Sequence, residues 1–200
     1  MLLISGAGTT LLLLASFAGF WVSWHSFQSF SDEVELHRLD ERLTLQLQIE
    51  FKKQIQEWKD VLIRGYEAEA LDKYWKNFET QERKVQETGN YLLENLRDEP
   101  QSLALVRQFI SAHKDMGTSY RNGLQVFKEN HFDSHAADKM IKGIDRPAAE
   151  LLNQAAEKIA VIAQQSSRNE VESGRRGILV SLGFMGLAVV LAFFIRPKQN

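Results

Sequence analysis

Three basic and three aromatic residues are the side chains whose types and spacing best suit ligand binding. The cations are Arg64, Lys73 and Arg146, and the aromatics are Trp58, Tyr74 and Trp75. Arginine can hold a carboxylate through two parallel hydrogen bonds, and cations beside aromatic rings suit a small anion. We predict that all six lie at one level of the fold and bind a small carboxylate or another anion. The alternative is a solvated charged surface with pairs inside one helix, such as Asp72 with Lys76.

A second cluster of candidate ligands lies in the segment HFDSHAAD. Its metal-binding residue types are His131, Asp133, His135 and Asp138. Imidazole and carboxylate groups suit zinc or nickel, and His131 and His135 are spaced for one helical face. The alternative is a polar turn at the tip of the fold. These four residues are weak candidates, and we predict no metal and no other cofactor.

No catalytic motif accompanies either cluster. The sequence lacks GxSxG, HExxH, GxxxxGK[ST] and GxGxxG, contains no cysteine, and has no Glu-x-x-His pair for a di-iron bundle. Its 24 Lys and Arg residues against 26 Asp and Glu residues leave no basic excess of the kind that nucleic-acid binders show. We predict a protein that is not an enzyme and does not bind nucleic acid.

The distribution of charged residues along the chain indicates the structural elements that hold these side chains. Residues 1–31 and 177–195 contain no Asp, Glu, Lys or Arg, and all but two of the charged residues lie in 32–176. As helices, 2–24 would reach about 34 Å and 177–195 about 28 Å, against a hydrocarbon core of about 30 Å. A cleaved signal peptide fits the first run less well because no Lys or Arg precedes it. A buried core helix fits the uninterrupted second run poorly. We predict transmembrane helices at 1–24 and 177–195.

The orientation rests on the short tail, 196–200, which has two positive charges and no negative ones. This balance favours the cytoplasm. We therefore expect a protein that crosses the bacterial inner membrane twice, with both termini in the cytoplasm and residues 25–176 in the periplasm.

Apolar residues in 25–176 recur at three- and four-residue steps, which is the pattern of amphipathic helices. In the first of these helices they form one predicted core stripe: Leu36, Leu39, Leu43, Leu47, Phe51, Ile55, Trp58 and Leu62. The pattern stops at Gly65 and before Pro100, and Gly143 and Pro147 interrupt it again. We predict helices over about 25–64, 67–98 and 101–130, a short helix over about 134–142, and a long helix after it. The expected fold is all-α, an antiparallel up-down-up-down four-helix bundle flanked by two transmembrane helices. His113 falls at a core position, where we expect its ring to be satisfied across the bundle.

Two segments, FKKQIQEWKDVLIRGYEAEALDKYW at 51–75 and KGIDRPAAELL at 142–152, lie between the two apolar runs. Together they resemble the extracytoplasmic four-helix-bundle sensor of bacterial methyl-accepting chemotaxis proteins, over residues 1 to about 195. The resemblance implies a sensory module for chemotaxis-type signal transduction that detects an extracytoplasmic signal and transmits it by movement of transmembrane helix 2. It implies a homodimer, with a small anionic ligand or a periplasmic binding protein as the signal.

The sequence departs from such receptors after residue 195. They continue into a HAMP linker and a cytoplasmic coiled coil with methylation sites, whereas only RPKQN follows here. We expect a sensor without the usual output domain: a truncated reading frame, a fragment or a stand-alone sensor. The alternative function is a non-sensory, membrane-anchored helical scaffold or assembly protein that binds a protein partner.

Overall fold

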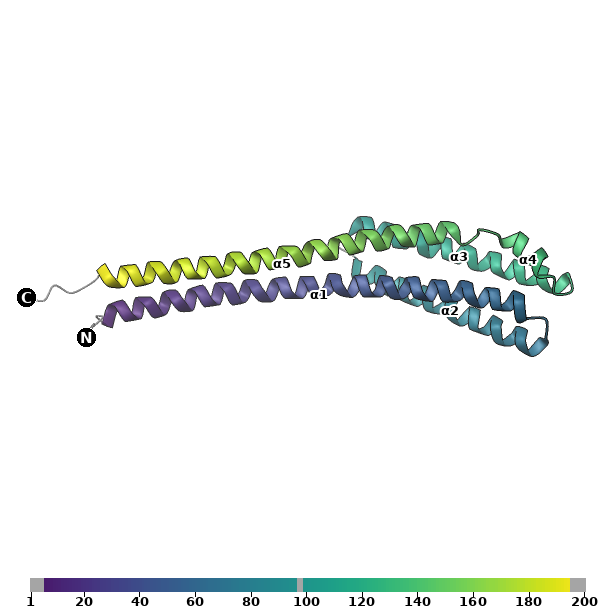
Figure 1. Ribbon diagram of the computed structural model, residues 1–200, viewed down its shortest axis with the longest axis horizontal. Helices are drawn as coiled ribbons and strands as arrows, with labels where there is room; N and C mark the ends of the chain where they lie inside the picture. The colour runs from purple at the N-terminus through teal and green to yellow at the C-terminus, as the bar shows by residue number, and fades with distance from the viewer. Residues whose placement is uncertain (1–5, 97–98, 195–200) are drawn as a thin grey trace, which may run out of the picture. The chain divides into compact units, whose positions relative to one another are not determined.

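The computed structural model describes residues 6–96 and 99–194, and within these it leaves out many side chains of 7–33 and 188–194. The described residues form α-helices joined by short turns, and no strand. The helices are α1 (Gly6–Arg64), α2 (Ala68–Asn95), α3 (Pro100–Glu129), α4 (Ser134–Ile141) and α5 (Arg146–Phe194) (Figure 1). The all-helical prediction is confirmed.

The helix ends fall where the sequence carries breaking residues. The backbone N–H of Gly65 donates to the carbonyl of Val61 at 2.8 Å and closes the last turn of α1. Pro100 is the first residue of α3, a position where the missing N–H costs no hydrogen bond. Gly143 has a φ of 77°, which other residues rarely adopt, and it separates α4 from α5. The predicted break between a short helix and a long one is confirmed.

The chain divides into two compact units. One consists of Met1–Leu36 with Gln164–Asn200, and the other of His37–Ala163. We call the first the terminal unit and the second the bundle unit.

Hydrogen bonds give the direction of the first two helices in the bundle unit. Asn77 on α2 donates to Glu57 on α1 at 3.2 Å, and Thr88 on α2 donates to Glu50 on α1 at 2.8 Å. The residue number rises on α2 as it falls on α1. The two helices are therefore antiparallel.

The same reasoning places the other two long helices of the bundle unit. On α2 and α3, Gln86 pairs with His113 and Glu82 pairs with Arg121, so these helices are also antiparallel. The side chain of Lys158 on α5 donates to Gln101 on α3, and the ribbon of α5 runs in the direction opposite to that of α3 (Figure 1). Segments of α1, α2, α3 and α5 thus form an up-down-up-down bundle within this unit, as predicted.

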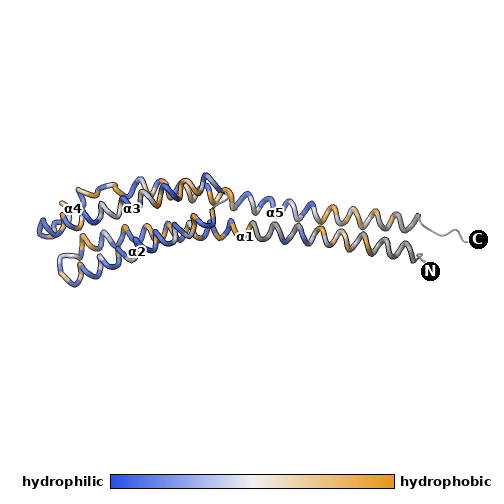
Figure 2. Tube along the Cα trace, turned by 180° about the vertical axis from the view of Figure 1, so that it is seen from behind, coloured by the Kyte–Doolittle hydropathy of each residue, from blue (hydrophilic) through white to orange (hydrophobic). Residues whose placement is uncertain are grey.

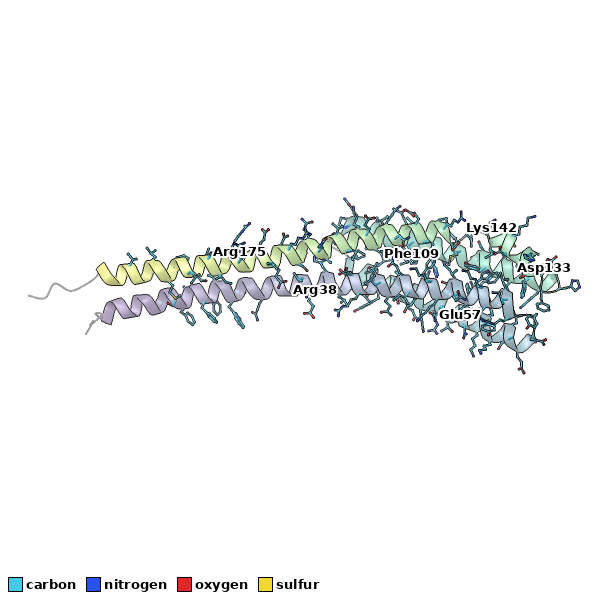
Figure 3. The ribbon with its side chains drawn as sticks, in the orientation of Figure 1. Arg38, Glu57, Phe109, Asp133, Lys142 and Arg175 are labelled. Atoms are coloured by element: carbon cyan, nitrogen blue, oxygen red, sulfur yellow. The ribbon has the colours of Figure 1, made fainter. Side chains whose placement is uncertain are left out.

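Side chains that are almost fully buried fill the space between these helices, and Figure 3 shows Phe109 among them. The largest are Trp58, Phe78, Phe109, Tyr120 and Phe127. Aromatic pairs add attraction beyond the area they bury because ring edges meet ring faces. The Phe78 and Tyr120 rings meet in this way, with centroids 5.1 Å apart.

The buried face of α1 differs from the predicted stripe. The apolar pattern assigned Ile55 and Leu62 to the core, but both are only partly buried, whereas Gln54 and Val61 are fully buried. Residues 47, 51, 54, 58 and 61 follow a regular alternation of four- and three-residue steps, and this is the spacing that faces a neighbouring helix. Ile55 and Leu62 pack against the core from its edge, and the adjacent Gln54 and Val61 take the central positions.

Large apolar side chains of the terminal unit are exposed, among them Phe17 at 67%, Trp21 at 62%, Leu179 at 60% and Leu187 at 56%. Figure 2 shows the hydrophobic colour taking over toward the end of α5. Within the described residues, no helical stretch meets the length and apolarity of a membrane span. Much of 1–24 and the end of 177–195 lie outside the described side chains. The two transmembrane helices therefore stay predictions.

One carboxyl group of the bundle unit is buried near the start of its α1 segment. Asp40 is 2% exposed, and its Oδ1 has no hydrogen-bond partner among the described residues. Burial raises the pKa of Asp40 to about 6, His37 opposes the rise and Glu99 adds to it. Ionising Asp40 therefore costs more free energy in the folded protein than in the unfolded chain.

Replacing Asp40 should therefore stabilise the fold at neutral pH only. The pKa of the Asp40 carboxyl is 3.8 in the unfolded chain and about 6 in the folded protein. The protonated carboxyl therefore contributes to the stability of the fold. This contribution is fully present below pH 3.8 and is lost as the pH rises through about 6. We expect Asp40→Asn to raise the free energy of unfolding by about 1–3 kcal/mol at about pH 7.5. The gain should vanish at about pH 3.5.

Denaturant unfolding of the full chain across this pH range measures the effect. Asp115→Asn, at an exposed position on α3, is the matched control and should change stability little at any pH. A variant at position 40 that is equally stable with the wild type at both pH values would contradict the prediction.

Candidate functional site

Two of the predicted cations and one predicted aromatic meet where α1 ends and α2 begins. The guanidinium carbon of Arg64 lies 5.7 Å from the centroid of the Tyr74 ring, and Nζ of Lys73 lies 5.5 Å from it. Arg64 is the last residue of α1, and Lys73 and Tyr74 are in the second turn of α2. We call these three residues the cation–aromatic group. Both cations are exposed, so an anion from solution can reach them.

Arg64 already has a partner in its own helix. It forms an ion pair with Asp60, one turn earlier. The side chain of Arg64 is 54% exposed, and exposed pairs of this kind contribute at most about 1 kcal/mol. A bidentate carboxylate ligand can compete for the guanidinium, so the pair does not block the site.

The two tryptophans of the predicted site belong to the core instead. Trp58 is 2% exposed, and its ring lies 6.5 Å from that of Trp75 and 5.0 Å from that of Tyr120. Trp75 is partly buried and stacks on Phe78 with centroids 4.9 Å apart. We call Trp58, Trp75, Phe78 and Tyr120 the aromatic layer. Trp75 follows Tyr74 directly in α2, so this layer supports the cation–aromatic group from within.

Arg146 lies elsewhere in the same unit. It is the first residue of α5, and its side chain lies close to Gly143. Its Nε would be 3.4 Å from the Cβ of any larger residue at position 143. In the described part of the chain, no hydrogen bond, ion pair or ring contact joins Arg146 to Arg64, Lys73 or Tyr74. A role for Arg146 in anion binding stays a prediction.

The histidine-rich segment forms a tight turn between α3 and α4. His131 and Phe132 have φ values of 54° and 64°, and the Phe132 N–H donates to the Phe127 carbonyl at 2.8 Å. Asp133, which Figure 3 labels at this turn, accepts a hydrogen bond from the backbone N–H of His135 at 2.9 Å and caps α4. No three metal-ligating side chains come together in the part of the chain that the structure describes. The segment therefore forms a polar turn that leads into a capped helix.

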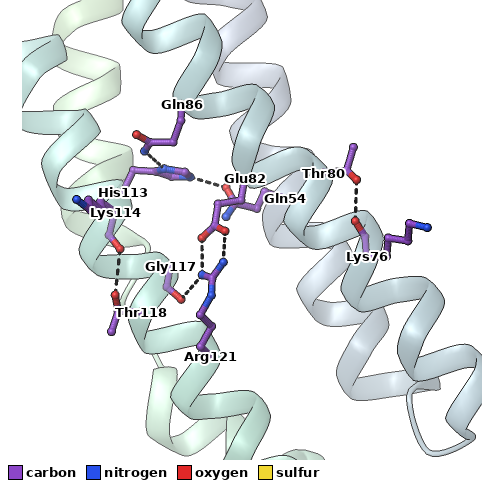
Figure 4. Close-up of polar contacts among 10 residues, drawn as sticks. All are labelled: Gln54, Lys76, Thr80, Glu82, Gln86, His113, Lys114, Gly117, Thr118 and Arg121. Carbon is purple, nitrogen blue, oxygen red and sulfur yellow. Dashed lines mark hydrogen bonds and ion pairs between the residues drawn. The ribbon is translucent and has the colours of Figure 1, made fainter.

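A buried polar layer is the feature that the sequence reasoning largely missed. His113 on α3 is 0% exposed, and its ring bridges two other helices (Figure 4). Its Nε2 lies 2.6 Å from Oε1 of Gln54 on α1, and its Nδ1 lies 2.5 Å from Nε2 of Gln86 on α2. We call these three residues the histidine layer. The expectation that the His113 ring is satisfied across the bundle is confirmed.

The partners fix the protonation of His113. An amide oxygen only accepts and an amide nitrogen only donates, so Nε2 carries the hydrogen and Nδ1 accepts. The ring is therefore neutral. Burial lowers the pKa of His113 to about 4, and the carboxylate of Glu82 raises it only in part.

An ion pair beside the histidine layer joins α2 to α3. The guanidinium of Arg121 donates to both carboxylate oxygens of Glu82, at 2.8 and 2.5 Å, and also to the carbonyl of Gly117 at 2.9 Å. The pKa of Arg121 is raised, chiefly by its hydrogen bond to Glu82. A side chain at 117 would collide with Oε1 of Glu82, so glycine lets the carboxylate reach α3. We call this arrangement the clasp.

The core spacing on α1 was the signal for the histidine layer. Gln54 lies three residues after Phe51 and four before Trp58, both fully buried. A glutamine at such a position needs a polar partner inside the fold, because a buried amide without one is costly. His113, at a core position of α3, is the partner of this kind.

The fold is of the all-α helical-bundle class, and it carries two exposed cations beside one aromatic ring. Comparison with known proteins gives the family. The chain is 32% identical over 166 residues to the methyl-accepting chemotaxis protein CtpH of Pseudomonas aeruginosa. The match covers 76% of this chain and 28% of that protein. No family model matches the chain, and no solved structure matches it.

The resemblance seen in the sequence is thereby confirmed: the chain contains a region of the methyl-accepting chemotaxis protein type. It spans less than a third of the length of the relative that it matches.

The pKa of His113 predicts a loss of stability in acid. The unfolded ring takes up a proton near pH 6.5 and the folded ring only near pH 4, so acidification favours the unfolded chain. The full stability is present above about pH 6.5, and about 2–3 kcal/mol should be lost by about pH 4. His113→Gln should remove this loss.

The measurement is the difference in unfolding free energy between wild type and variant at several pH values. The opposite contribution of Asp40 is common to both proteins and cancels in the difference. His135→Gln, at an exposed position, is the control and should leave the slope unchanged. A difference between wild type and His113→Gln that does not vary with pH would disprove the assignment.

Proposed function

We propose that the chain is the sensory region of a chemoreceptor and serves chemotaxis-type signal transduction. The observation that carries the proposal is the 32% identity to a methyl-accepting chemotaxis protein across 76% of this chain. The helical bundle supports it, because a bundle can hold a ligand site at one end and extend into long signalling helices. We propose further that the chain is not itself an enzyme, since its sequence holds none of the common catalytic motifs.

The terminal unit is proposed to anchor the chain in the bacterial inner membrane. Residues 1–31 and 177–195 lack charged side chains, and the apolar side chains described there are exposed. An exposed apolar surface of this extent needs lipid or a protein to cover it. With two positive charges after residue 195, both termini would lie in the cytoplasm and residues 25–176 in the periplasm.

The proposed signal is a small anion bound at the cation–aromatic group. Arg64 and Lys73 supply two positive charges, and the ring of Tyr74 lies within 6 Å of both, at 5.7 and 5.5 Å. A carboxylate that drew Arg64 away from Asp60 would connect the end of α1 to the start of α2. A periplasmic binding protein that presents an acidic side chain is the second form that the signal can take.

The proposed receptor is a homodimer, as the relationship to chemoreceptors implies, and the signal passes as a small movement of α5 along its axis. A ligand shifts such an equilibrium only by its difference in affinity for the two positions of the helix. The alternative, a helical scaffold that binds a protein partner, is supported by the exposed Phe132 and Met140 near the α3–α4 turn, at 41% and 53%. The ligand experiment separates the two.

Loss of either cation should abolish or weaken carboxylate binding while the fold persists. We expect one or more members of a panel of mono-, di- and tricarboxylates to raise the melting temperature of the purified full chain. Arg64→Ala and Lys73→Ala should each weaken the binding about tenfold or more, because each removes a charge-assisted contact.

Arg83→Ala is the matched control for this experiment. Arg83 is an exposed cation on α2 that pairs with Glu87, and its loss should leave the shift unchanged. If no carboxylate shifts the melting temperature, or if the shift survives both substitutions, the anion site is wrong and the scaffold function gains support.

The absence of cysteine from the chain makes its topology directly testable. A single cysteine in place of Lys128, an exposed residue of α3, should react with a membrane-impermeant maleimide added to intact spheroplasts. A single cysteine in place of Gln199 should react only after the cells are lysed. Equal labelling of both positions in intact spheroplasts would rule out the proposed topology.

A further inference from the structure

A line of cations on α3 is separate from the cation–aromatic group, and its spacing is regular. Arg107, Lys114, Arg121 and Lys128 follow one another at intervals of seven residues, which is about 10.5 Å along a helix. All four residues are exposed. We call them the basic stripe, and it runs for about 32 Å along α3.

The core of the bundle unit places these four cations on one strip of the surface. Each of them directly follows a buried residue of α3, and these buried residues are Val106, His113, Tyr120 and Phe127. The buried residues fix which face of α3 points inward, so the position after each of them has the same orientation in the bundle. The fold therefore holds the four charges in line.

The helix itself offers the basic stripe no carboxylate. On a helix, a cation pairs with an acidic residue three or four positions away. Arg64 pairs in this way with Asp60, and Arg83 with Glu87. At three and four positions on either side of each cation of the basic stripe, the sequence has neither Asp nor Glu. The stripe thus depends on other elements for its counter-charges.

A neighbouring helix supplies a carboxylate to one member of the stripe. Glu82 on α2 holds Arg121 in the clasp, whereas Lys114 extends away from Glu82 (Figure 4). Among the described residues, no ion pair includes Arg107, Lys114 or Lys128. Three exposed charges of one sign in a line attract a surface of the opposite sign.

The surface beside the basic stripe suits a second helix. The exposed positions next to it hold small, uncharged side chains, namely Ala104, Ser111 and Thr118. Small side chains allow the axis of a second helix to approach closely. Beyond them, Asp115 and Glu129 are exposed, and they would repel a partner that is negative on every side. The surface therefore fits a helix with carboxylates along one edge better than it fits a uniformly charged polyanion.

We propose that the basic stripe is a docking surface for a protein partner that presents an α-helix with a carboxylate at every seventh position. Helices that pack side by side share a seven-residue period, so each carboxylate of such a helix meets one cation of the stripe. Arg107, Lys114 and Lys128 gain counter-charges, and Arg121 stays with Glu82. The proposal goes beyond the anion site and does not depend on it.

Binding of a designed peptide to the purified full chain tests this surface. The probe is a fluorescently labelled helical peptide of four heptads, built from alanine and glutamine with one glutamate in each heptad. We expect it to bind at low salt and to be released as salt is added. A peptide of the same composition, with its glutamates on different faces, should bind about tenfold more weakly or less, because it can meet only one cation at a time.

Replacing the three unpaired cations of the stripe should weaken binding of the probe about tenfold or more, because each exposed ion pair contributes a few-fold in affinity. This variant carries Arg107→Gln, Lys114→Gln and Lys128→Gln. The matched control changes the net charge equally on exposed positions of α1, and it carries Lys52→Gln, Lys53→Gln and Lys59→Gln. The control should change the affinity by less than about twofold, since charges on another face are screened.

Reversing the charges gives a second test that does not depend on a loss of binding. A variant with Arg107→Glu, Lys114→Glu and Lys128→Glu should release the glutamate probe and bind a peptide with lysine at the heptad positions instead. Circular dichroism follows the helix content of every variant. Arg64 and Lys73 are unchanged throughout, so the carboxylate assay of the anion site gives a separate result.

The proposal is overturned if the two glutamate peptides bind equally, or if the stripe variant and the control variant weaken the probe equally. It is also overturned if the reversed stripe does not bind the lysine peptide. Polygalacturonate, a linear polyanion, is the last probe. If it binds as tightly as the heptad peptide and loses its binding in the same stripe variant, the stripe recognises a polyanion and the proposed helical partner is wrong.

Discussion

The centre of the bundle depends on the two hydrogen bonds of a neutral, fully buried imidazole. His113 needs a donor on one side and an acceptor on the other, and these come from different helices at 2.5 and 2.6 Å. Leaving either nitrogen unpaired costs about 1–3 kcal/mol, so the helices must keep a register that serves both. Apolar packing tolerates a small slide of one helix along another, whereas this pair of bonds does not. The histidine layer therefore fixes α1, α2 and α3 relative to one another.

The clasp and the aromatic layer extend this constraint toward the end of the bundle. Gly117 allows the carboxylate of Glu82 to approach α3, and Arg121 holds it there with two hydrogen bonds. Arg121 in turn lies over Trp75, whose ring stacks on Phe78. Each contact limits the freedom of the next. The position of Tyr74, which follows from that of α2, is thus set by polar bonds deeper in the bundle.

The sequence was sufficient for the helices and for their antiparallel order, because helix ends are local events. Gly65, Pro100 and Gly143 each act on their own backbone, and the structure breaks its helices beside all three. The site was predicted less completely. The turn between α1 and α2 separates Arg64 from Lys73 and Tyr74 by only a few residues, and the structure brings the three together as expected. Trp58 was assigned to the ligand, but the core encloses it.

The histidine layer was harder to predict because it depends on which side chain of two adjacent candidates faces inward. Ile55 is the more apolar residue and Gln54 the one that is buried. The free energy gained by burying an isoleucine had to be weighed against a hydrogen bond to a histidine 59 residues away in sequence. Composition and periodicity describe one helix at a time, so they do not indicate His113 as the distant partner of Gln54. Residue pairs of this kind become predictable only when two helices are considered together.

The four segments of the bundle unit are not held equally, and the difference bears on how a signal could leave it. The polar bonds between α1, α2 and α3 include buried ones to His113. The side-chain hydrogen bonds between α5 and these helices are exposed: Gln48 on α1 donates to Asn153, and Lys158 donates to Gln101 on α3. The buried residues of α5 are Ala148, Leu152, Ala155, Ile159 and Ala163, which pack without direction. Small side chains present a smooth surface, and water can replace an exposed hydrogen bond at little cost. Of the long helices in this unit, α5 can therefore change its axial position with the least loss of bonding, which is what the proposed movement requires.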